Sequence, residues 1–468
     1  DLYGNKANSF WLDSSLEAAG SRFHVMGDAS GPLGAVVRYQ VRGQRLEILR
    51  GNQRELRSES VFSYLERELA ALQDLASGSL PCDFSCGYVG YFGYELKAEC
   101  GGDDAHQAAT PDAWFVRADR VLIFDTGARR LYLVCLTERG AAAQARQWFE
   151  DVEARLAALR PLPAVRGLAA APRFGLARER DGYLADIDAC LRQIRLGESY
   201  EVCLTNRITM DADVPPLDYY RVLRRTNPAP YAAFLHLGDV CVACSSPERF
   251  LRVDRAGQVE SRPIKGTLPR GRTPDEDAAL RERLRASEKD RSEHLMIVDL
   301  VRNDLGRVCE IGSVHVPGYM EIESFATVHQ MVSTIRGTLR PDASAIGCVR
   351  AAFPGGSMTG APKIRTMRII DALEPGARGV YSGAIGWLSA GGAAELAIVI
   401  RTAVIEPRRA TMGVGGAIVA LSRPDAELDE ILLKGQALMR AAAQMALPAD
   451  DLDGLDGPDG PDGPDGPG

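Results

Sequence analysis

One lysine of this chain stands in a setting suited to nucleophilic chemistry. An extended run from Arg249 to Val253 leads through a turn to a second run, Gln258 to Arg262, and then to Pro263-Ile264-Lys265-Gly266-Thr267. This pattern predicts a hairpin that presents one amine beside flexible backbone. Burial lowers the pKa of an ammonium group, so we expect Lys265 to be an activated amine nucleophile. On this stretch alone, a surface lysine after a proline is the alternative.

A glycine-rich loop, Pro-Gly-Gly-Ser-Met-Thr-Gly-Ala-Pro-Lys over residues 354–363, runs into a predicted helix whose first turn carries Pro362. Backbone N–H groups at such a helix start, together with the hydroxyls of Ser357 and Thr359, form a cradle suited to a carboxylate. The loop is not a phosphate-binding Walker A motif, because Gly360 is followed by Ala rather than by Lys and Ser or Thr. A plain helix-entry loop is the alternative.

Acidic residues on two predicted helices suggest a cation site. Glu293 lies on one helix, and Glu427 and Glu430 share a face of the last helix because they are three residues apart. Carboxylates without a Cys or His cluster suit a hard cation such as Mg²⁺, although surface acids explain each helix better when it is taken alone. Glu248, just before the hairpin, would act as a general acid if its pKa is raised.

Three further features carry polar or flexible groups. His329 follows a predicted strand, where a lone histidine is more often structural. The segment 413–417 predicts a second glycine-rich turn, directly before the helix with Glu427 and Glu430. Arg401 ends the strand before that turn and could pair with a carboxylate through two hydrogen bonds.

The elements that must position these groups divide the chain into four parts. Residues 1–159 form a strand-rich region, residues 160–174 a linker rich in Pro, Ala and Gly, and residues 175–446 a larger region of strands and helices. The acidic Gly-Pro-Asp repeats of residues 447–468 predict disorder. Adjacent strands joined by short turns predict an α+β fold of large, mostly antiparallel sheets packed face to face as a sandwich, with helices outside. Long helices are expected over 60–75, 141–159, 180–196, 217–226, 276–305 with an interruption near 290, 343–352, 362–373 and 424–445.

Composition excludes several classes of protein. The chain has 468 residues, 46% of them hydrophobic, and a formal net charge of -8, which argues against a nucleic-acid partner. No stretch approaches the roughly 18 apolar residues of a membrane span. The ten cysteines lie mostly in apolar runs, and Cys241 and Cys244 lack a second pair at zinc spacing. The start at Asp1 has no initiator Met and no signal features, so we expect a cytoplasmic protein, cut from a longer polypeptide.

Five motifs occur together and in a fixed order: Ser246-Pro247-Glu248, Pro263 to Thr267, Glu293 to Asp304, Gly355 to Lys363, and Tyr381-Ser382-Gly383. In these motifs the chain resembles the chorismate-utilising enzymes. That family includes component I of aminodeoxychorismate synthase and of anthranilate synthase and, more distantly, isochorismate and salicylate synthases. The resemblance is strongest over residues 175–446 and implies the chorismate-binding enzyme fold.

Within this family, the position of Lys265 separates two reactions. Anthranilate synthases carry a small residue there, whereas a lysine is typical of the enzymes that aminate chorismate at C4. The resemblance implies that Lys265 attacks C2 of the ring while Glu248 protonates the departing C4 hydroxyl, and that ammonia then adds at C4 and expels the lysine. The implied product is 4-amino-4-deoxychorismate, on the route to p-aminobenzoate. Glu201 stands where isochorismate-forming relatives carry a water-activating lysine, which disfavours water addition.

The resemblance also implies further site residues. Glu293 and Glu430, with Glu427 nearby, match the family's Mg²⁺ ligands, and His329 matches a histidine near the ring. The remaining implied residues surround the bound substrate: Ser357, Thr359, Gly360, Tyr381, Arg401, Gly415, Gly266, Thr267 and Lys434.

The ammonia must come from another protein chain or domain. None of the ten cysteines lies in the Gly-x-Cys-x-Gly setting of a glutaminase nucleophile, so we expect a glutamine amidotransferase subunit or a fused glutaminase domain as partner. Two alternatives stay open. The chain could form anthranilate or aminodeoxyisochorismate, which Lys265 disfavours, or it could be a non-catalytic homologue that only binds a glutaminase. Phe10 to Ser14 departs from the family's tryptophan-feedback motif.

Overall fold

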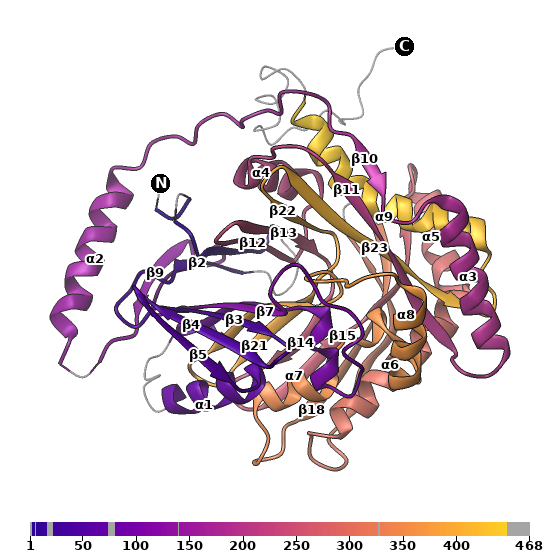
Figure 1. The fold of residues 1–468 in the computed structure, drawn as a ribbon, viewed down its shortest axis with the longest axis horizontal. Helices are drawn as coiled ribbons and strands as arrows, with labels where there is room; N and C mark the ends of the chain where they lie inside the picture. The colour runs from indigo at the N-terminus through magenta and orange to yellow at the C-terminus, as the bar shows by residue number, and fades with distance from the viewer. Residues whose placement is uncertain are drawn as a thin grey trace.

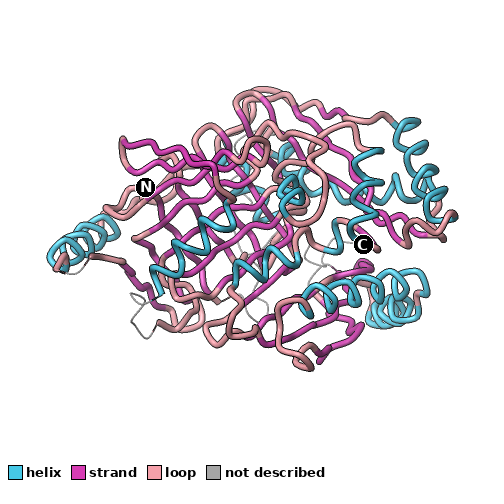
Figure 2. The backbone as a smooth tube through the Cα atoms, turned by 60° about the horizontal axis from the view of Figure 1, so that its bottom comes forward, coloured by secondary structure: helices cyan, strands magenta, loops and turns pink. Residues whose placement is uncertain are grey.

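The computed structural model describes residues 2–4, 6–15, 22–73, 80–138, 140–325 and 328–446. The expected disordered tail, residues 447–468, lies outside these described residues. Two large sheets dominate the molecule, and helices cover their outer faces (Figures 1 and 2). Every strand pairing in the described ranges is antiparallel, so the predicted fold class is confirmed.

The first sheet contains eleven strands. Their order is β10 (Phe174–Leu176), β11 (Glu201–Met210), β23 (Arg409–Val419), β22 (Thr402–Glu406), β13 (Val240–Ser246), β12 (Tyr231–Leu237), β1 (Ser9–Asp13), β2 (Phe23–Asp28), β8 (Arg120–Asp125) and β9 (Arg130–Cys135), with β19 (Gly360–Ala361) paired to β11.

The second sheet contains twelve strands. Their order is β16 (Ile264–Pro269), β18 (Val328–Thr338), β15 (Gln258–Arg262), β14 (Arg249–Val253), β21 (Ala394–Ile398), β20 (Ala384–Ser389), β6 (Gly87–Phe92), β7 (Ala113–Ala118), β3 (Ala35–Gln40), β4 (Arg45–Arg50) and β5 (Gln53–Ser58), with β17 (His315–Ser324) paired to β18.

Three large apolar cores hold the layers together, and a small fourth cluster joins Leu284 to Met320, Ile322 and Met331. One lies between the sheets and includes Phe10 and Leu235 of the first sheet and Tyr91 of the second. The other two join each sheet to its own helices, so that the helices bury their apolar faces against the sheets. The helices are α1 (Val61–Gln73), α2 (Ala142–Ala157), α3 (Arg180–Arg195), α4 (Pro216–Thr226), α5 (Pro274–Ala286), α6 (Glu288–Gly306), α7 (Ala345–Ala352), α8 (Lys363–Leu373) and α9 (Pro424–Gln444), besides 3-10 turns at Tyr94–Glu99 and Gly356–Met358.

The N-terminal strands are built into both sheets. β1 pairs with β12, with Phe10 opposite Leu235, and β6 pairs with β20, with Val89 opposite Trp387. Strands from residues 1–159 and from residues 175–446 therefore share continuous hydrogen-bonded ladders. The sequence predicts separate regions over residues 1–159 and 175–446, whereas each sheet contains strands from both regions (Figure 1).

Local expectations near the site hold with one exception. The hairpin of β14 and β15 forms as predicted, and the long helix is interrupted at Ser287, whose hydroxyl caps α6 by accepting from the Asp290 N–H. The predicted turn at 413–417 is wrong, because these residues lie inside the continuous strand β23. Their glycines leave room for an aromatic ring, as described below.

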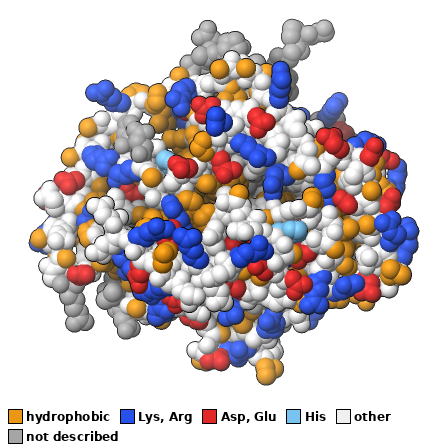
Figure 3. Space-filling view, viewed as in Figure 1, with side chains coloured by type: hydrophobic (Ala, Val, Ile, Leu, Met, Phe, Trp, Pro, Cys, Tyr) orange, Lys and Arg blue, Asp and Glu red, His pale blue; other side chains and the backbone are white. Residues whose placement is uncertain are grey.

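The charged surface and the cysteine side chains of the structure agree with the composition of the chain. Basic and acidic side chains are interspersed over the face shown in Figure 3. All ten cysteines, each within the described ranges, are free thiols. None of the helices in the described part of the chain combines the length and apolarity that a membrane crossing requires.

A buried arginine ties the loop after α8 to both the first sheet and the glycine-rich loop. Arg378 donates two hydrogen bonds of 2.8 Å to the Glu374 carboxylate, one of 2.8 Å to the Cys203 carbonyl and one of 2.7 Å to the Met358 carbonyl. Its side chain is 2% exposed and that of Glu374 is 5% exposed. The pair therefore holds three segments together without access to water.

Replacing Arg378 should strongly destabilise the fold. Arg378→Met leaves the Glu374 carboxylate buried without its partner, and breaking a buried pair in this way costs about 3–5 kcal/mol. The free energy of unfolding in urea measures the loss. Arg368→Met is the matched control, because its ion pair with Asp103 is about half exposed and should contribute little. Equal stability of the two variants would contradict the role given to Arg378.

Candidate active site

The Lys265 amine lies between two carboxylates that come from different layers of the fold. Its Nζ is 2.6 Å from Oε1 of Glu201, at the start of β11, and 3.8 Å from Oε2 of Glu293 on α6. The Lys265 side chain is 10% exposed and that of Glu201 is fully buried. Gly266 has a φ of +76°, and the register of β16 against β18 shifts there. This bulge turns the strand directly after the lysine.

The expectation that burial lowers the pKa of Lys265 is wrong. Burial does favour the neutral amine, but the carboxylates of Glu201 and Glu293 outweigh it and raise the pKa above that of an ordinary lysine. The sequence places the lysine beside apolar strands, yet the fold also delivers two acids to it. Lys265 is therefore an ammonium at neutral pH and must lose a proton before it attacks a carbon atom.

Glu248 has the properties of a general acid. Its carboxylate is buried, and Oε1 accepts a 2.9 Å hydrogen bond from the Ser357 hydroxyl. Burial raises the pKa of Glu248 to about 7, although the Ser357 hydrogen bond and the Lys265 charge favour the ionised form. A carboxyl group with this pKa is protonated in a large fraction of molecules at neutral pH and can donate its proton.

A buried lysine, Lys363, anchors the glycine-rich loop. Lys363 Nζ lies 2.6 Å from Asp304 Oδ2 and donates to the carbonyls of Ala352 and Pro354 at 2.7 and 2.9 Å. Ser357 therefore stands on a loop tied to α6. The expected anion cradle differs in one respect, because its serine hydroxyl donates to Glu248 in this structure.

Thr359 and Gly360 shape this loop. The Thr359 hydroxyl is fully buried and donates to the carbonyls of Gly355 and Gly356. A Cβ atom on Gly360 would lie 1.9 Å from the Glu201 carbonyl oxygen. The loop can pack against the start of β11 only because this position is a glycine, and the same packing brings Ser357 and Glu201 to one region.

The Lys289 ammonium lies between an acid of α6 and an acid of α9. Lys289 Nζ is 2.7 Å from Oε1 of Glu427 and 3.8 Å from Oε1 of Glu293. Burial raises the pKa of Glu293 to about 7. Glu430 is partly exposed and pairs at 2.7 Å with Lys434, whose Nζ donates to the Gly415 carbonyl.

The residues present fit a hard cation in type but do not converge on one point. Oε2 of Glu427 is buried and has no hydrogen-bond partner among the described residues. Carboxylate oxygens are the ligands that Mg²⁺ prefers. In the described ranges, however, no three Asp, Glu, His or Cys side chains come together at metal-binding distance. Lys289 pairs with Glu427 there, and Lys434 pairs with Glu430.

Tyr381 packs on the glycines of β23. A Cβ atom on Gly413 would lie 2.0 Å from the ring of Tyr381, and one on Gly415 would lie 3.2 Å from its hydroxyl. Arg401 donates to the Lys434 carbonyl, and burial lowers its pKa. Tyr381, Arg401, Gly415 and Lys434 thus form one connected group next to Glu430 of α9, and their expected contact with substrate stays a prediction.

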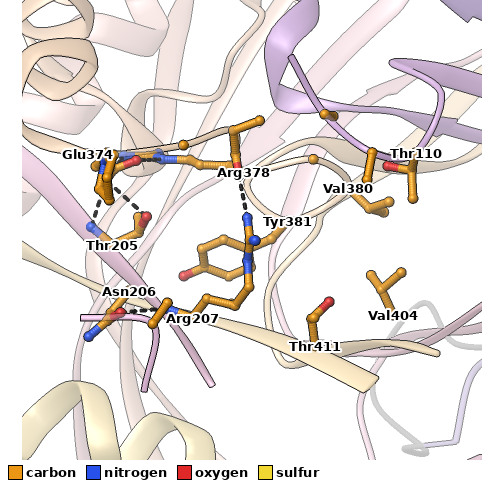
Figure 4. A pocket seen from close by; sticks show the side chains of 18 of the residues that line it. Thr110, Thr205, Asn206, Arg207, Glu374, Arg378, Val380, Tyr381, Val404 and Thr411 are labelled. Atoms are coloured by element: carbon orange, nitrogen blue, oxygen red, sulfur yellow. Dashed lines mark hydrogen bonds and ion pairs between the residues drawn. The ribbon is translucent and has the colours of Figure 1, made fainter. Parts of the chain in front are cut away.

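A cavity of about 470 Å³ lies next to Tyr381 (Figure 4). Thr205, Arg207, Glu374 and Arg378 line it together with Tyr381. The Glu374 carboxylate is satisfied by Arg378 and by the Thr205 N–H and hydroxyl, each at 2.8 or 2.9 Å. Thr205 and Glu201 point to the same side of β11, since they are four residues apart on one strand.

His329 lies in a separate hydrogen-bonded group. Its ring nitrogens are 2.7 Å from the Ser324 hydroxyl and 2.9 Å from the Asp277 carboxylate. No hydrogen bond or ion pair in the described part of the chain joins His329 to Lys265 or Glu248, so its expected place near the ring stays a prediction. Thr267 is exposed on β16, and its expected role also stays a prediction.

The structure adds residues that the sequence did not single out. His294 is buried, its Nε2 is 2.6 Å from the Ser333 hydroxyl, and burial and the charge of Lys265 lower its pKa to about 4. Lys289 is the other addition. Its position four residues before Glu293 on one helix was the only signal of an ion pair in the sequence.

Comparisons with known proteins identify the family of this chain. The chorismate binding enzyme family matches residues 30–440. An aminodeoxychorismate synthase from Streptomyces pristinaespiralis is 50% identical over 456 residues, which cover 95% of this chain and 63% of that relative. Component 1 of anthranilate synthase from Pseudomonas putida is 39% identical over 376 residues, covering 77% of this chain and 75% of that relative.

A solved structure shares the architecture. Anthranilate synthase component I from Streptococcus pneumoniae TIGR4 superimposes with a TM-score of 0.77 at 30% identity, covering 91% of this chain and 94% of that one. The present chain spans less than two thirds of the length of its aminodeoxychorismate synthase relative. From the match over residues 30–440 and from these likenesses in sequence and fold, the chain belongs to the chorismate-binding enzyme family.

Proposed function

We propose that this chain aminates chorismate at C4 with ammonia and forms 4-amino-4-deoxychorismate, on the route to p-aminobenzoate. One observation carries the proposal: the Lys265 amine is held between Glu201 and Glu293, in the same site as a buried carboxyl group, Glu248, with a pKa of about 7. The similarity to aminodeoxychorismate synthase supports it, at 50% identity against 39% for anthranilate synthase component 1.

The first displacement uses Lys265 as the nucleophile. The ammonium passes a proton to Glu201 Oε1, 2.6 Å away, and the freed lone pair forms a bond to C2 of the ring. The conjugated double bonds shift, the bond from C4 to its hydroxyl breaks, and Glu248 gives the departing group its proton so that it leaves as water. The lysine nitrogen, bound to C2, then carries the positive charge.

The second displacement reverses the first with a different nucleophile. Ammonia bonds to C4, the double bonds shift back, and the bond between C2 and the lysine nitrogen breaks. Lys265 recovers its proton from Glu201, and the new C4 ammonium gives a proton to Glu248. Both acids return to their starting states. Two displacements at one face of the site replace a single difficult substitution.

Mg²⁺ is the cation that the acids of α6 and α9 would hold, with Glu293 and Glu427 as ligands and Glu430 as a third. When bound, it would neutralise the ring carboxylate of chorismate. Arg401, the Tyr381 hydroxyl and the Ser357 loop would bind the second carboxylate, the one on the enolpyruvyl group.

The source of ammonia is proposed to be a glutamine amidotransferase, either as a separate subunit or as a domain fused to this chain. The proposal rests on the chemistry of the reaction and on the lack of a Gly-x-Cys-x-Gly motif in the sequence. Ammonium salt supplies the same nitrogen in vitro, so the reaction can be tested without the partner.

Lys265→Ala should abolish amination at C4. Purified protein is incubated with chorismate, Mg²⁺ and ammonium chloride, and the products are identified by mass before and after a 4-amino-4-deoxychorismate lyase is added. The unaltered chain should give p-aminobenzoate only with the lyase. The variant should lose at least about a thousandfold in rate, since removing a nucleophile raises the barrier by several kcal/mol. Anthranilate from the unaltered chain, or an undiminished rate in the variant, would exclude the proposed route.

The rate should fall above about pH 7, because Glu248 must be protonated to act as an acid. Ser357→Ala removes a hydrogen bond that stabilises the carboxylate, so the pKa of Glu248 rises and the falling limb moves to higher pH. A hydrogen bond to a charged group is worth about 1.5 kcal/mol, which corresponds to about one pH unit. The pH profile of kcat measures the shift. Ser58→Ala, at an exposed position of β5, serves as control, and identical profiles for both variants would refute the assignment.

Glu427→Gln and Glu430→Gln should each raise the Mg²⁺ concentration needed for half-maximal rate by about tenfold or more, because each removes a charged oxygen ligand. Calorimetric titration with Mg²⁺ gives a second measure that is independent of turnover. Glu321→Gln, at an exposed position of β17, is the control. A titration curve unchanged from that of the unaltered chain would remove the residue concerned from the metal site.

A further inference from the structure

Glu201 is a buried acid with one oxygen unused. Its side chain is fully buried. Oε1 accepts the Lys265 hydrogen bond at 2.6 Å, whereas Oε2 has no hydrogen-bond partner among the described residues. A buried carboxylate oxygen without a donor is costly, and most such oxygens in proteins are satisfied. An unsatisfied oxygen beside the Lys265 amine calls for an explanation, and an N–H or O–H donor of a ligand supplies one.

The surroundings of Glu201 favour a small donor. On its side of β11 the next residue is Cys203, which is buried, and the backbone of β19 pairs alongside, with Ala361 opposite Glu201. Lys265 is the cation that contacts Glu201, and its contact uses the other oxygen. A donor at Oε2 must therefore be small enough to fit beside the lysine amine.

The spacing of the two oxygens matches the proposed reaction. Lys265 attacks C2 and ammonia attacks C4, and these two ring atoms are separated by a single carbon. The two oxygens of a carboxylate are also separated by a single carbon. One carboxylate can therefore hold one nitrogen at each oxygen, so that the two nitrogens face the two ring positions that they attack in turn.

We propose that Oε2 of Glu201 is the binding subsite for ammonia. Ammonia donates an N–H to this oxygen and keeps its lone pair directed at C4, beside the position that Lys265 takes at C2. This inference rests on the proposed amination and names the residue that receives its second substrate. Glu201 thus holds both nitrogen nucleophiles, one on each oxygen.

The subsite predicts a selective loss of ammonium affinity. In Glu201→Gln the side-chain amide has one oxygen and one NH₂ group, so it cannot accept from both nitrogens. The KM for ammonium should rise about tenfold or more, as expected when a buried hydrogen-bond acceptor is lost, while the KM for chorismate changes less than about twofold. Initial rates with varied ammonium chloride at saturating chorismate and Mg²⁺ measure this. Glu201→Asp, which keeps both oxygens, should recover part of the affinity.

The control is Glu198→Gln, the same substitution three residues earlier, where the carboxylate pairs with Arg365 at a half-exposed position. An unchanged KM for ammonium in Glu201→Gln, with or without a lower kcat, overturns the subsite, because Glu201 then acts only through Lys265. If Glu201→Gln does not fold, a KM for ammonium in Glu201→Asp that equals that of the control also overturns it. Failure of the unaltered chain to aminate chorismate instead overturns the proposed function itself.

Discussion

The site depends on a single buried charge pair, the Lys265 ammonium and the Glu201 carboxylate. Taking both groups out of water is favourable only if they meet at close range, as they do at 2.6 Å. Lys265 comes from β16, at the edge of the second sheet, and Glu201 from β11, near the edge of the first. The fold must therefore hold these two sheet edges at a fixed distance from each other. The glycine-rich loop and α6 pack beside the two edges.

The sequence predicts the elements well where local pattern decides them. The hairpin before Lys265 follows from two extended runs around a turn, and the helix break near Ser287 follows from its polar sequence. The two-sheet architecture follows from many short strands with turn residues between them. The shared sheets of the N-terminal and C-terminal regions could not be predicted, because pairing such as that of β1 with β12 joins residues more than 200 positions apart.

The sequence identifies candidate site residues, but it does not reveal their protonation states. Lys265, Glu248 and Glu293 carry their motifs in the sequence, yet the pKa of Lys265 depends on Glu201, which is 64 residues away and reaches it only through the fold. The glycines of β23 show the same limit. A run rich in glycine is typical of a turn, but here the missing side chains make room for the Tyr381 ring, which a local pattern does not reveal.

Lys289 has a thermodynamic consequence for the acids of α6 and α9. Its ammonium already neutralises Glu427 at 2.7 Å and lies 3.8 Å from Glu293, so the two helices are held together by a cation that belongs to the chain itself. A divalent ion that binds there exchanges with a tethered competitor whose local concentration is fixed and high. The apparent free energy of binding of the ion is then the difference between the binding free energies of the ion and of the Lys289 ammonium. For the proposed Mg²⁺ site, a side chain that supplies the competing charge would make metal occupancy weak and readily reversible.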